Sequence, residues 1–386
     1  MSPRIEARAV VVVVLSALAL VAACDNKSVG SPVDAGQSDG SWTPPIENLG
    51  EPGWRDSDEP WDPVEHDSRL AFDVWSRPGA VYVLHGGIHD SWGPDDTGDP
   101  CGYRISVNDG TGWQTLVEWG EDSGMYSPAE LRLTGFSDGR ILTRFPDSGM
   151  GELGIITDNG TASGQGFTAL DVFVVSDNLV YAISNLEDKI VRFNGAGWEP
   201  VPVEMPYYVS CVWADATSLF AVGSSGTILS LEGDSWRIHD SGTLDSFTAI
   251  WGFAEDDVWV GSAEGYLFHW DGQVWNEVPW PDALAGTEHY ASIGGMWGAD
   301  GVLYFHTFWQ LVRVDSSGLH NIAAWPCEER EDPNGGTSCE GGVKINAIWG
   351  NSPEELFLAV NAPLDHAGDD QNVFLLWYDG AQFHWF

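Results

Sequence analysis

The chain has 386 residues and is strongly acidic, with 16 Lys and Arg against 58 Asp and Glu and a formal net charge of −42. This composition excludes nucleic acid as a partner, because neutralising phosphates requires clustered Lys and Arg. The 46 glycines and 12% aromatic residues favour many short strands joined by tight turns.

The first residues have the parts of a secretory signal peptide. Arg4 and Arg8 precede an apolar run at 9–23 that ends in small residues. The run is too short for an ordinary membrane span, so it indicates export. Val21-Ala22-Ala23-Cys24 resembles a bacterial lipobox, which implies removal of residues 1–23 and diacylation of Cys24. The alternative is ordinary cleavage with Cys24 unmodified.

Residues 24–63 are expected to be a flexible tether. They are rich in Ser, Gly, Asp and Pro and lack a hydrophobic period, so they cannot bury enough apolar surface to fold. Asp25 follows the lipobox cysteine, a position that favours inner-membrane retention in enteric-type lipoproteins but not in general. We therefore expect a lipid-anchored protein of the bacterial cell envelope, at the outer membrane or the cell surface, with the lipid as its only membrane contact.

Four further cysteines agree with an oxidising compartment. Cys327 and Cys339 enclose a polar, turn-rich segment, so a local disulfide between them is the preferred pairing. Cys101 with Cys211 remains by elimination only, since Cys211 could equally be a small apolar core residue. No CxxC pair occurs, which argues against a structural zinc site.

Seven copies of one pattern follow the tether. Each has an apolar segment ending in Trp or Phe, a polar turn, and two alternating strands that close on an acidic or amide residue and glycine. The copies are at 72–87 with 103–113, 130–146 with 154–160, 170–198, 211–236, 250–275, 295–318, and 347–363 with 372–383.

The closing dipeptides predict hairpins. Asn-Gly and Asp-Gly between alternating apolar residues are typical of a type I′ turn, which needs a positive φ at both central residues. Six of the seven copies carry such a dipeptide: Asp109-Gly110, Asn159-Gly160, Asn194-Gly195, Glu232-Gly233, Asp271-Gly272 and Asp379-Gly380. The spacing suits units of four antiparallel strands.

The pattern predicts an all-β, seven-bladed β-propeller over residues 64–386, with six or eight blades as alternatives. It resembles the WG-x-DVW-x-VG repeat of exported bacterial propellers, and SVNDGTGW at 106–113 is similar to the Asp-box of sialidase-like and photosystem-assembly-type propellers. Asn108 and Gly112 depart from that box. Ring closure has two alternatives, because the chain ends at FHWF (383–386) while GWR (53–55) could supply a closing strand.

The tryptophans of the best-preserved copy, Trp251, Trp259, Trp270 and Trp275, are expected to pack within or between blades. Function is then expected in the unrepeated loops. The long insertions all join second to third strands or one blade to the next, so they share one face of a propeller. They lie at 85–102, 118–130, 146–152, 279–292, 323–342 and 361–372.

Two of these insertions, in the first and last blades, become neighbours when the ring closes. They could bind Ca2+ through carboxylates, or zinc through a His and Asp mixture, and the alternative is a pair of solvated acidic loops. The candidate ligands are His85, His89, Asp90, Asp95, Asp96, Asp99, Asp365, His366, Asp369 and Asp370.

Four tryptophans outside the repeat, Trp92, Trp119, Trp280 and Trp325, are candidates for stacking on sugar rings or anchoring a protein, with local loop packing as the alternative. We expect a monomeric binding module for an envelope protein or polysaccharide. A carbohydrate-active hydrolase or lyase of sialidase-like type is the second hypothesis. No arginine sits in the sialidase motif, and no GxSxG or HExxH motif occurs.

Overall fold

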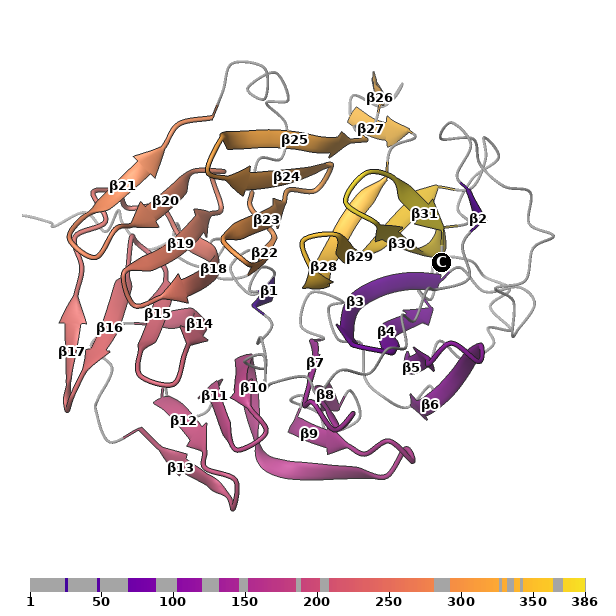
Figure 1. Cartoon of the computed structure of the whole chain (residues 1–386), viewed down its shortest axis with the longest axis horizontal. Coiled ribbons are helices and arrows are strands. Elements are labelled where there is room, and N and C mark those ends of the chain that lie inside the picture. The colour runs from indigo at the N-terminus through magenta and orange to yellow at the C-terminus, as the bar shows by residue number, and fades with distance from the viewer. Residues whose placement is uncertain are drawn as a thin grey trace, which may run out of the picture.

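The computed structural model describes residues 25–26, 47–48, 69–87, 103–119, 132–145, 152–184, 189–201, 208–280, 292–325, 328–331, 337–340, 343–363 and 371–385. In these ranges the regular structure is entirely β, and no helix long and apolar enough to span a membrane occurs among them. The blades surround a common axis (Figure 1).

The strands form seven antiparallel four-stranded blades. Three are separate four-stranded sheets, two are five-stranded sheets that include one extra short strand, and two share a seven-stranded sheet. Blade 1 comprises β3 (Arg69–Arg77), β4 (Ala80–Gly87), β5 (Tyr103–Asn108) and β6 (Trp113–Trp119). Blade 2 comprises β7 (Leu133–Gly135), β8 (Ile141–Phe145), β9 (Glu152–Ile156) and the first half of β10 (Ala162–Ser176).

The second half of β10 is the innermost strand of blade 3, so one continuous strand joins blades 2 and 3. Blade 3 continues with β11 (Leu179–Ser184), β12 (Lys189–Phe193) and β13 (Trp198–Pro200). Blade 4 comprises β14 (Val209–Ala214), β15 (Leu219–Gly223), β16 (Ile228–Glu232) and β17 (Ser235–Ile238). Blade 5 comprises β18 (Phe247–Ala254), β19 (Asp257–Ser262), β20 (Leu267–Trp270) and β21 (Trp275–Val278).

The last two blades complete the ring. Blade 6 comprises β22 (Gly295–Ala299), β23 (Val302–His306), β24 (Gln310–Asp315) and β25 (Gly318–Ala324). Blade 7 comprises β28 (Lys344–Ser352), β29 (Glu355–Pro363), β30 (Gln371–Tyr378) and β31 (Phe383–Trp385). Between them lies a hairpin of β26 (Glu328–Glu331) and β27 (Thr337–Glu340). The sequence prediction of a seven-bladed all-β propeller is confirmed.

Two short strands near the N-terminus pair with blades that already have four strands of their own. β1 (Asp25–Asn26) pairs in parallel with the innermost strand of blade 6, near the axis in Figure 1. β2 (Glu47–Asn48) pairs with β31 as a fifth, outermost strand of blade 7. Blade 7 therefore takes its four strands from the C-terminal chain. The candidate closing residues 53–55 lie outside the described residues.

The ring closes where blade 7 meets blade 1. Trp349 Nε1 donates to Ser76 O at 2.8 Å, and Ser76 Oγ donates to Asn351 Oδ1 at 3.1 Å. Ala71 is held at both backbone polar atoms, because its N donates to Asn361 Oδ1 at 3.1 Å and its O accepts from Asn346 Nδ2 at 2.6 Å. Hydrogen bonds from side chains of blade 7 thus satisfy backbone groups at the edge of β3.

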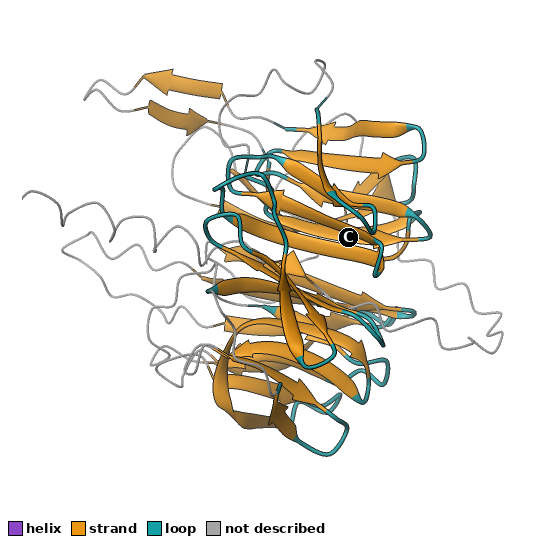
Figure 2. Cartoon of the chain, turned by 90° about the vertical axis from the view of Figure 1, so that its left-hand side faces the viewer, coloured by secondary structure: helices purple, strands orange, loops and turns teal. Residues whose placement is uncertain are grey.

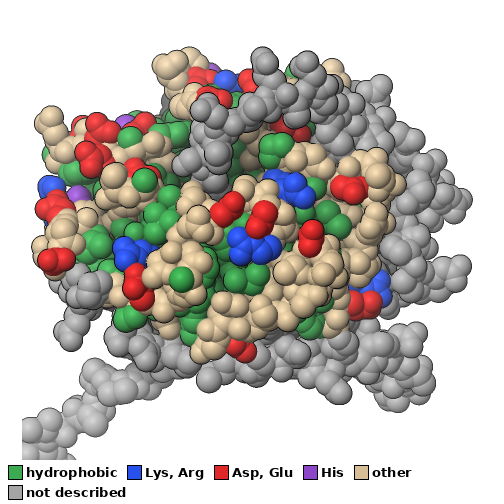
Figure 3. Space-filling view, turned by 60° about the horizontal axis from the view of Figure 1, so that its bottom comes forward, with side chains coloured by type: hydrophobic (Ala, Val, Ile, Leu, Met, Phe, Trp, Pro, Cys, Tyr) green, Lys and Arg blue, Asp and Glu red, His purple; other side chains and the backbone are tan. Residues whose placement is uncertain are grey.

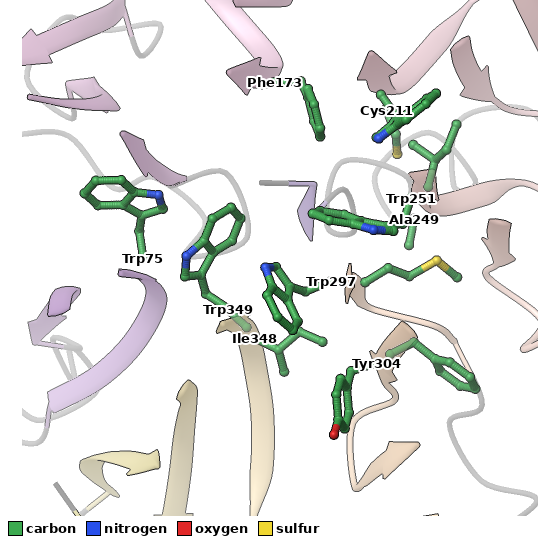
Figure 4. Close-up of a cluster of buried hydrophobic side chains, with 14 of the residues drawn as sticks. Trp75, Phe173, Cys211, Ala249, Trp251, Trp297, Tyr304, Ile348 and Trp349 are labelled. Carbon is green, nitrogen blue, oxygen red and sulfur yellow. The ribbon is translucent and has the colours of Figure 1, made fainter. Parts of the chain in front are cut away.

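The tryptophan-glycine dipeptide of the repeat is explained by packing between blades. The Trp213 ring lies against Gly252 of the next blade, where a Cβ would come within 2.6 Å of it. Trp251 packs in the same way on Gly298, and Trp297 on Gly350. Glycine is required because the indole fills the space that a side chain would occupy. The aromatic rings follow one another about the axis (Figure 4).

The best-preserved copy, blade 5, uses its tryptophans for packing as expected. Trp251 is fully buried and Trp270 is 5% exposed. Trp259 and Trp275 are half-buried against the core, and Trp259 stacks on His269 with ring centroids 4.0 Å apart. These residues therefore serve the architecture rather than a ligand.

The predicted type I′ turns are wrong for the Asn-Gly and Asp-Gly dipeptides. At Asp271-Gly272 only the glycine has a positive φ, of 83°, whereas Asp271 has none. The Asp271 carboxylate instead accepts hydrogen bonds from the backbone N–H of Gln273 and of Val274, both at 2.9 Å. In such a turn, aspartate or asparagine is needed because its side-chain oxygen accepts hydrogen bonds from the backbone. It is not needed for a left-handed backbone conformation. Asp300-Gly301, with φ of 52° and 74°, does have positive φ at both residues.

Candidate functional face

The strands run between two faces of the ring, as Figure 2 shows from the side. One face, here called the turn face, carries the turns from first to second and from third to fourth strands. The other, here called the loop face, carries the connections from second to third strands and those between blades. In blade 1, β3 and β4 are separated by two residues, whereas β4 ends at Gly87 and β5 begins at Tyr103.

The turn face is made of compact turns, and several of their carboxylates accept hydrogen bonds from within the same turn. Asp109 Oδ1 accepts from the N–H of Thr111 at 3.0 Å and from its hydroxyl at 2.6 Å, and these bonds lower the pKa of Asp109. Backbone N–H groups of Val274 and Gln273 lower the pKa of Asp271 in the same manner. Acidic groups on this face thus hold the turns together.

The proposed metal ligands lie almost entirely outside the described residues. Only His85 is described, at the end of β4, where it is 4% exposed and its Nε2 lies 2.8 Å from Ser106 Oγ. Among the described residues no group of three or more His, Cys, Asp or Glu could hold a metal ion. Blades 1 and 7 are neighbours, as expected, so the two insertions do begin from adjacent blades. Metal binding by the remaining residues stays a prediction.

Three of the four candidate tryptophans are described, and each stands at or just after the end of an outermost strand. Trp119, Trp280 and Trp325 are all half-buried against the core. The Trp280 ring meets Phe305 of blade 6 edge-on at 5.4 Å, and the Trp325 ring meets Phe383 of blade 7 edge-on at 5.1 Å. Trp280 and Trp325 therefore pack between neighbouring blades. Trp92 lies outside the described residues, and ligand binding by these four tryptophans stays a prediction.

The cysteines are described in part. Cys211 is fully buried in β14 and is disulfide-bonded, so it is not a free core thiol. The register of the β26–β27 hairpin pairs Glu329 with Cys339, and Cys327 precedes that hairpin by one residue. The pairings of Cys101 with Cys211 and of Cys327 with Cys339 stay predictions, because Cys101 and Cys327 lie outside the described residues.

A small internal cavity near blades 1 to 3 gathers charged side chains, including Asp73, Arg132, Arg144 and Asp171. Asp73 is fully buried, and its two oxygens accept from the N–H groups of Val74 at 2.8 Å and Leu133 at 2.5 Å. Because backbone donors of blades 1 and 2 occupy both oxygens, Asp73 joins neighbouring blades.

Five other described arginines form ion pairs with carboxylates, each on a different blade. The pairs are Arg104 with Glu118, Arg140 with Asp138, Arg192 with Glu199, Arg237 with Glu232, and Arg313 with Asp315. On the side of the molecule in Figure 3, basic side chains likewise lie singly beside acidic ones.

The described part of the loop face has apolar side chains that sequence reasoning missed. Tyr208, Leu244 and Tyr266 are 44%, 84% and 46% exposed. Tyr208 precedes β14, Leu244 lies between β17 and β18, and Tyr266 lies between β19 and β20. In the sequence, the only sign of this surface is a large apolar residue inside a connection between strands.

Comparison with known proteins identifies the fold but no family. No protein-family model and no curated protein matches the chain. The WD40 propeller domain of Doa1 is similar with a TM-score of 0.51 at 11% identity, over 83% of this chain and 94% of that chain. YCF48 from Cyanidioschyzon merolae has a TM-score of 0.49 at 15% identity, over 84% and 97%. YCF48 bound to a D1 peptide has a TM-score of 0.47 at 12% identity, over 83% and 94%.

Proposed function

We propose that the protein is an exported propeller, anchored to the cell envelope by a lipid on Cys24, that binds an envelope protein or polysaccharide through its loop face. The observation that carries this proposal is the asymmetry of the two faces. Compact turns with engaged side chains form one face, and every long connection emerges from the other. Binding residues favour loops that a rigid core positions.

The described core supports a binding role over a catalytic one. Its buried tryptophans pack on glycines, the Asp73 carboxylate is satisfied by backbone N–H groups, and its surface arginines are paired on separate blades. These groups hold the ring together. Specificity then belongs to the connections on the loop face, which differ from blade to blade in length and sequence.

The anchor is tested by expressing the full chain in a bacterium and feeding an alkyne-labelled fatty acid. The wild-type chain should take up the label and fractionate with membranes. The Cys24→Ala variant should lose both properties. Unlabelled wild-type protein would overturn the lipid anchor while leaving the binding role open.

The binding role is tested by capture from envelope extracts with the immobilised chain, in separate protein and polysaccharide arms. Trp92→Ala alters a loop-face connection, and Gln273→Arg alters an exposed turn-face residue. We expect capture that Trp92→Ala reduces and Gln273→Arg leaves unchanged, with equal thermal stability of the variants. Equal capture by Trp92→Ala and Gln273→Arg would contradict the proposal.

A further inference from the structure

Exposed large apolar side chains are concentrated in one sector of the ring. Among the described residues there are five, and all lie in or beside blades 4 and 5: Tyr208, Ile238, Leu244, Tyr266 and Val274. Ile238 lies on an outermost strand, and Val274 lies on the turn face. The remaining three, Tyr208, Leu244 and Tyr266, share the loop face and are called here the apolar patch.

Backbone contacts tie the three residues of the patch to one another. The Tyr208 carbonyl lies against Gly223, the last residue of β15, and leaves no room there for a side chain. In the turn that follows, Gly226 N donates to Asp245 O at 2.7 Å, next to Leu244. Ala263 N, in the turn that carries Tyr266, donates to Ser246 O at 2.8 Å. The patch therefore spans adjoining turns of neighbouring blades.

The segment that presents Leu244 is held in shape. Ser241 Oγ donates to Gly226 O at 2.9 Å, Gly242 N donates to Asp240 Oδ1 at 3.1 Å, and Asp245 N donates to Thr243 Oγ1 at 3.1 Å. A leucine 84% exposed at the tip of a hydrogen-bonded segment gains nothing from packing within the chain. Ordered apolar surface of this kind is typical of a protein-binding site.

The charge around the patch is of one sign. Asp240 and Glu264 are exposed and Asp245 is half-buried. The segments 223–227, 240–246 and 262–266 contain no Lys or Arg. His239, beside Asp240, is 7% exposed, and burial lowers its pKa to about 4, so it is neutral at pH 7. The patch thus combines apolar contact area with an acidic margin.

The turns that flank the patch are short, whereas Tyr208 and Leu244 lie on eight-residue connections between blades. Four residues separate β15 from β16, and four separate β19 from β20. Tyr266 directly precedes β20, at the end of blade 5. A partner segment can rest directly on the rigid ends of blades 4 and 5.

We propose that the apolar patch docks a segment of a partner protein that combines Lys or Arg with Leu, Ile or Val. This rests on the proposed function and adds the place and the chemistry of one contact. The aliphatic residue covers Leu244, and the cations face Asp240, Asp245 and Glu264. Complementary charge raises the association rate, while the apolar contact determines the residence time.

The test is selection of random 12-residue peptides by phage display against the full chain. We expect enrichment of peptides that carry both Lys or Arg and an aliphatic residue. Leu244→Ser should weaken their binding by about tenfold or more, because it removes the central apolar contact. Asp240→Asn with Glu264→Gln should weaken it about threefold and reduce its dependence on salt.

Matched controls separate the outcomes. Val274→Ser removes an exposed apolar residue from the turn face and should leave peptide binding within twofold. Absence of enrichment, selection of peptides without cations, or equal binding by Leu244→Ser would overturn the patch as a docking site. If Trp92→Ala still reduced capture from envelope extracts, the proposed function would stand, because Trp92 belongs to the loop face but not to the patch.

Discussion

The contact between blades 5 and 6 and the contact between blades 3 and 4 use equivalent positions differently. Between blades 5 and 6, Trp251 packs on Gly298, and the residue two positions before the tryptophan is the small Ala249. Between blades 3 and 4, Phe173 takes the place of the tryptophan, and Asp171 takes the place of Ala249. The Asp171 carboxylate accepts a hydrogen bond from Val212 N at 2.7 Å.

The difference shows that departure from a repeat does not by itself mark a functional residue. Asp171 is 2% exposed and satisfies a backbone donor of the next blade, as Asp73 does for Leu133. Both aspartates break the apolar pattern and still serve packing between blades. Exposure and position on the loop face are the better criteria, and Leu244 meets both.

The largest effect on the free energy of unfolding is expected from making Trp251 of blade 5 smaller and Gly298 of blade 6 larger. Trp251→Thr should cost about 3–5 kcal/mol by leaving a cavity. Gly298→Val should cost about 2 kcal/mol or more by overpacking against Phe253 and Trp251. Blades 2 and 3 carry Thr134 and Val174 at these positions. The double variant should therefore be more stable than the sum of the single changes by at least about 1 kcal/mol. Urea unfolding measures this, and strict additivity would mean that the two sites do not share one space.

The next effect concerns the buried carboxylate of blade 3. Asp171→Ala should destabilise the protein by about 2–3 kcal/mol, because the Val212 N–H is left buried without its acceptor. Asp171→Asn retains an oxygen and should cost about half as much. The exposed Glu277→Ala serves as the control, with a change within about 0.5 kcal/mol. If Asp171→Ala were as mild as Glu277→Ala in thermal unfolding, the carboxylate would not join the blades.

A pH-dependent effect is expected at His239, between blades 4 and 5. Burial lowers its folded pKa from 6.5 to about 4, so the unfolded chain binds more protons between these values. Stability from the neutral ring is fully present above pH 6.5 and falls as the pH drops toward 4, by about 2 kcal/mol. His239→Gln keeps a donor for Ser230 and should remove this slope. Denaturant unfolding at pH 7, 5.5 and 4.5 compares the two proteins, and parallel curves would exclude His239 as the cause.

The smallest effect is expected in the turns of the turn face. Gly272→Ala should cost about 1 kcal/mol, because φ is 83° and the new Cβ would meet Asp256 Cβ at 2.8 Å. Gly197 has an ordinary φ and open space around it, so Gly197→Ala should be neutral. Thermal unfolding of both variants provides the comparison. Equal midpoints would show that the turn tolerates a side chain at Gly272.

The fold was predictable because each blade is built from consecutive strands with a repeated pattern. The aromatic, the glycine and the Asx residue recur at fixed places, and each has a local physical reason. The turn type was predicted wrongly because Asp271 acts through its side-chain acceptor, a role that the dipeptide alone does not distinguish from a left-handed backbone.

The sequence predicts which face of the ring carries the candidate site, but not which residues form it. The loop face follows from topology and insertion length, but exposure of single residues depends on tertiary packing. Trp280, for example, is a candidate for stacking on a ligand, and its half-buried state and its contact with Phe305 are not evident from the sequence. Leu244 has no distinctive sequence pattern and becomes informative only through its 84% exposure in the folded chain.

The junction between blades 7 and 1 has a consequence for the order of folding. Its hydrogen bonds join residues separated by 273 to 290 positions, such as Trp349 with Ser76 and Asn361 with Ala71. A chain synthesised from its N-terminus must complete blade 7 before β3 acquires these partners. Blade 1 therefore waits with one side uncovered until the last strands emerge, and this late, long-range step limits the rate at which the ring closes.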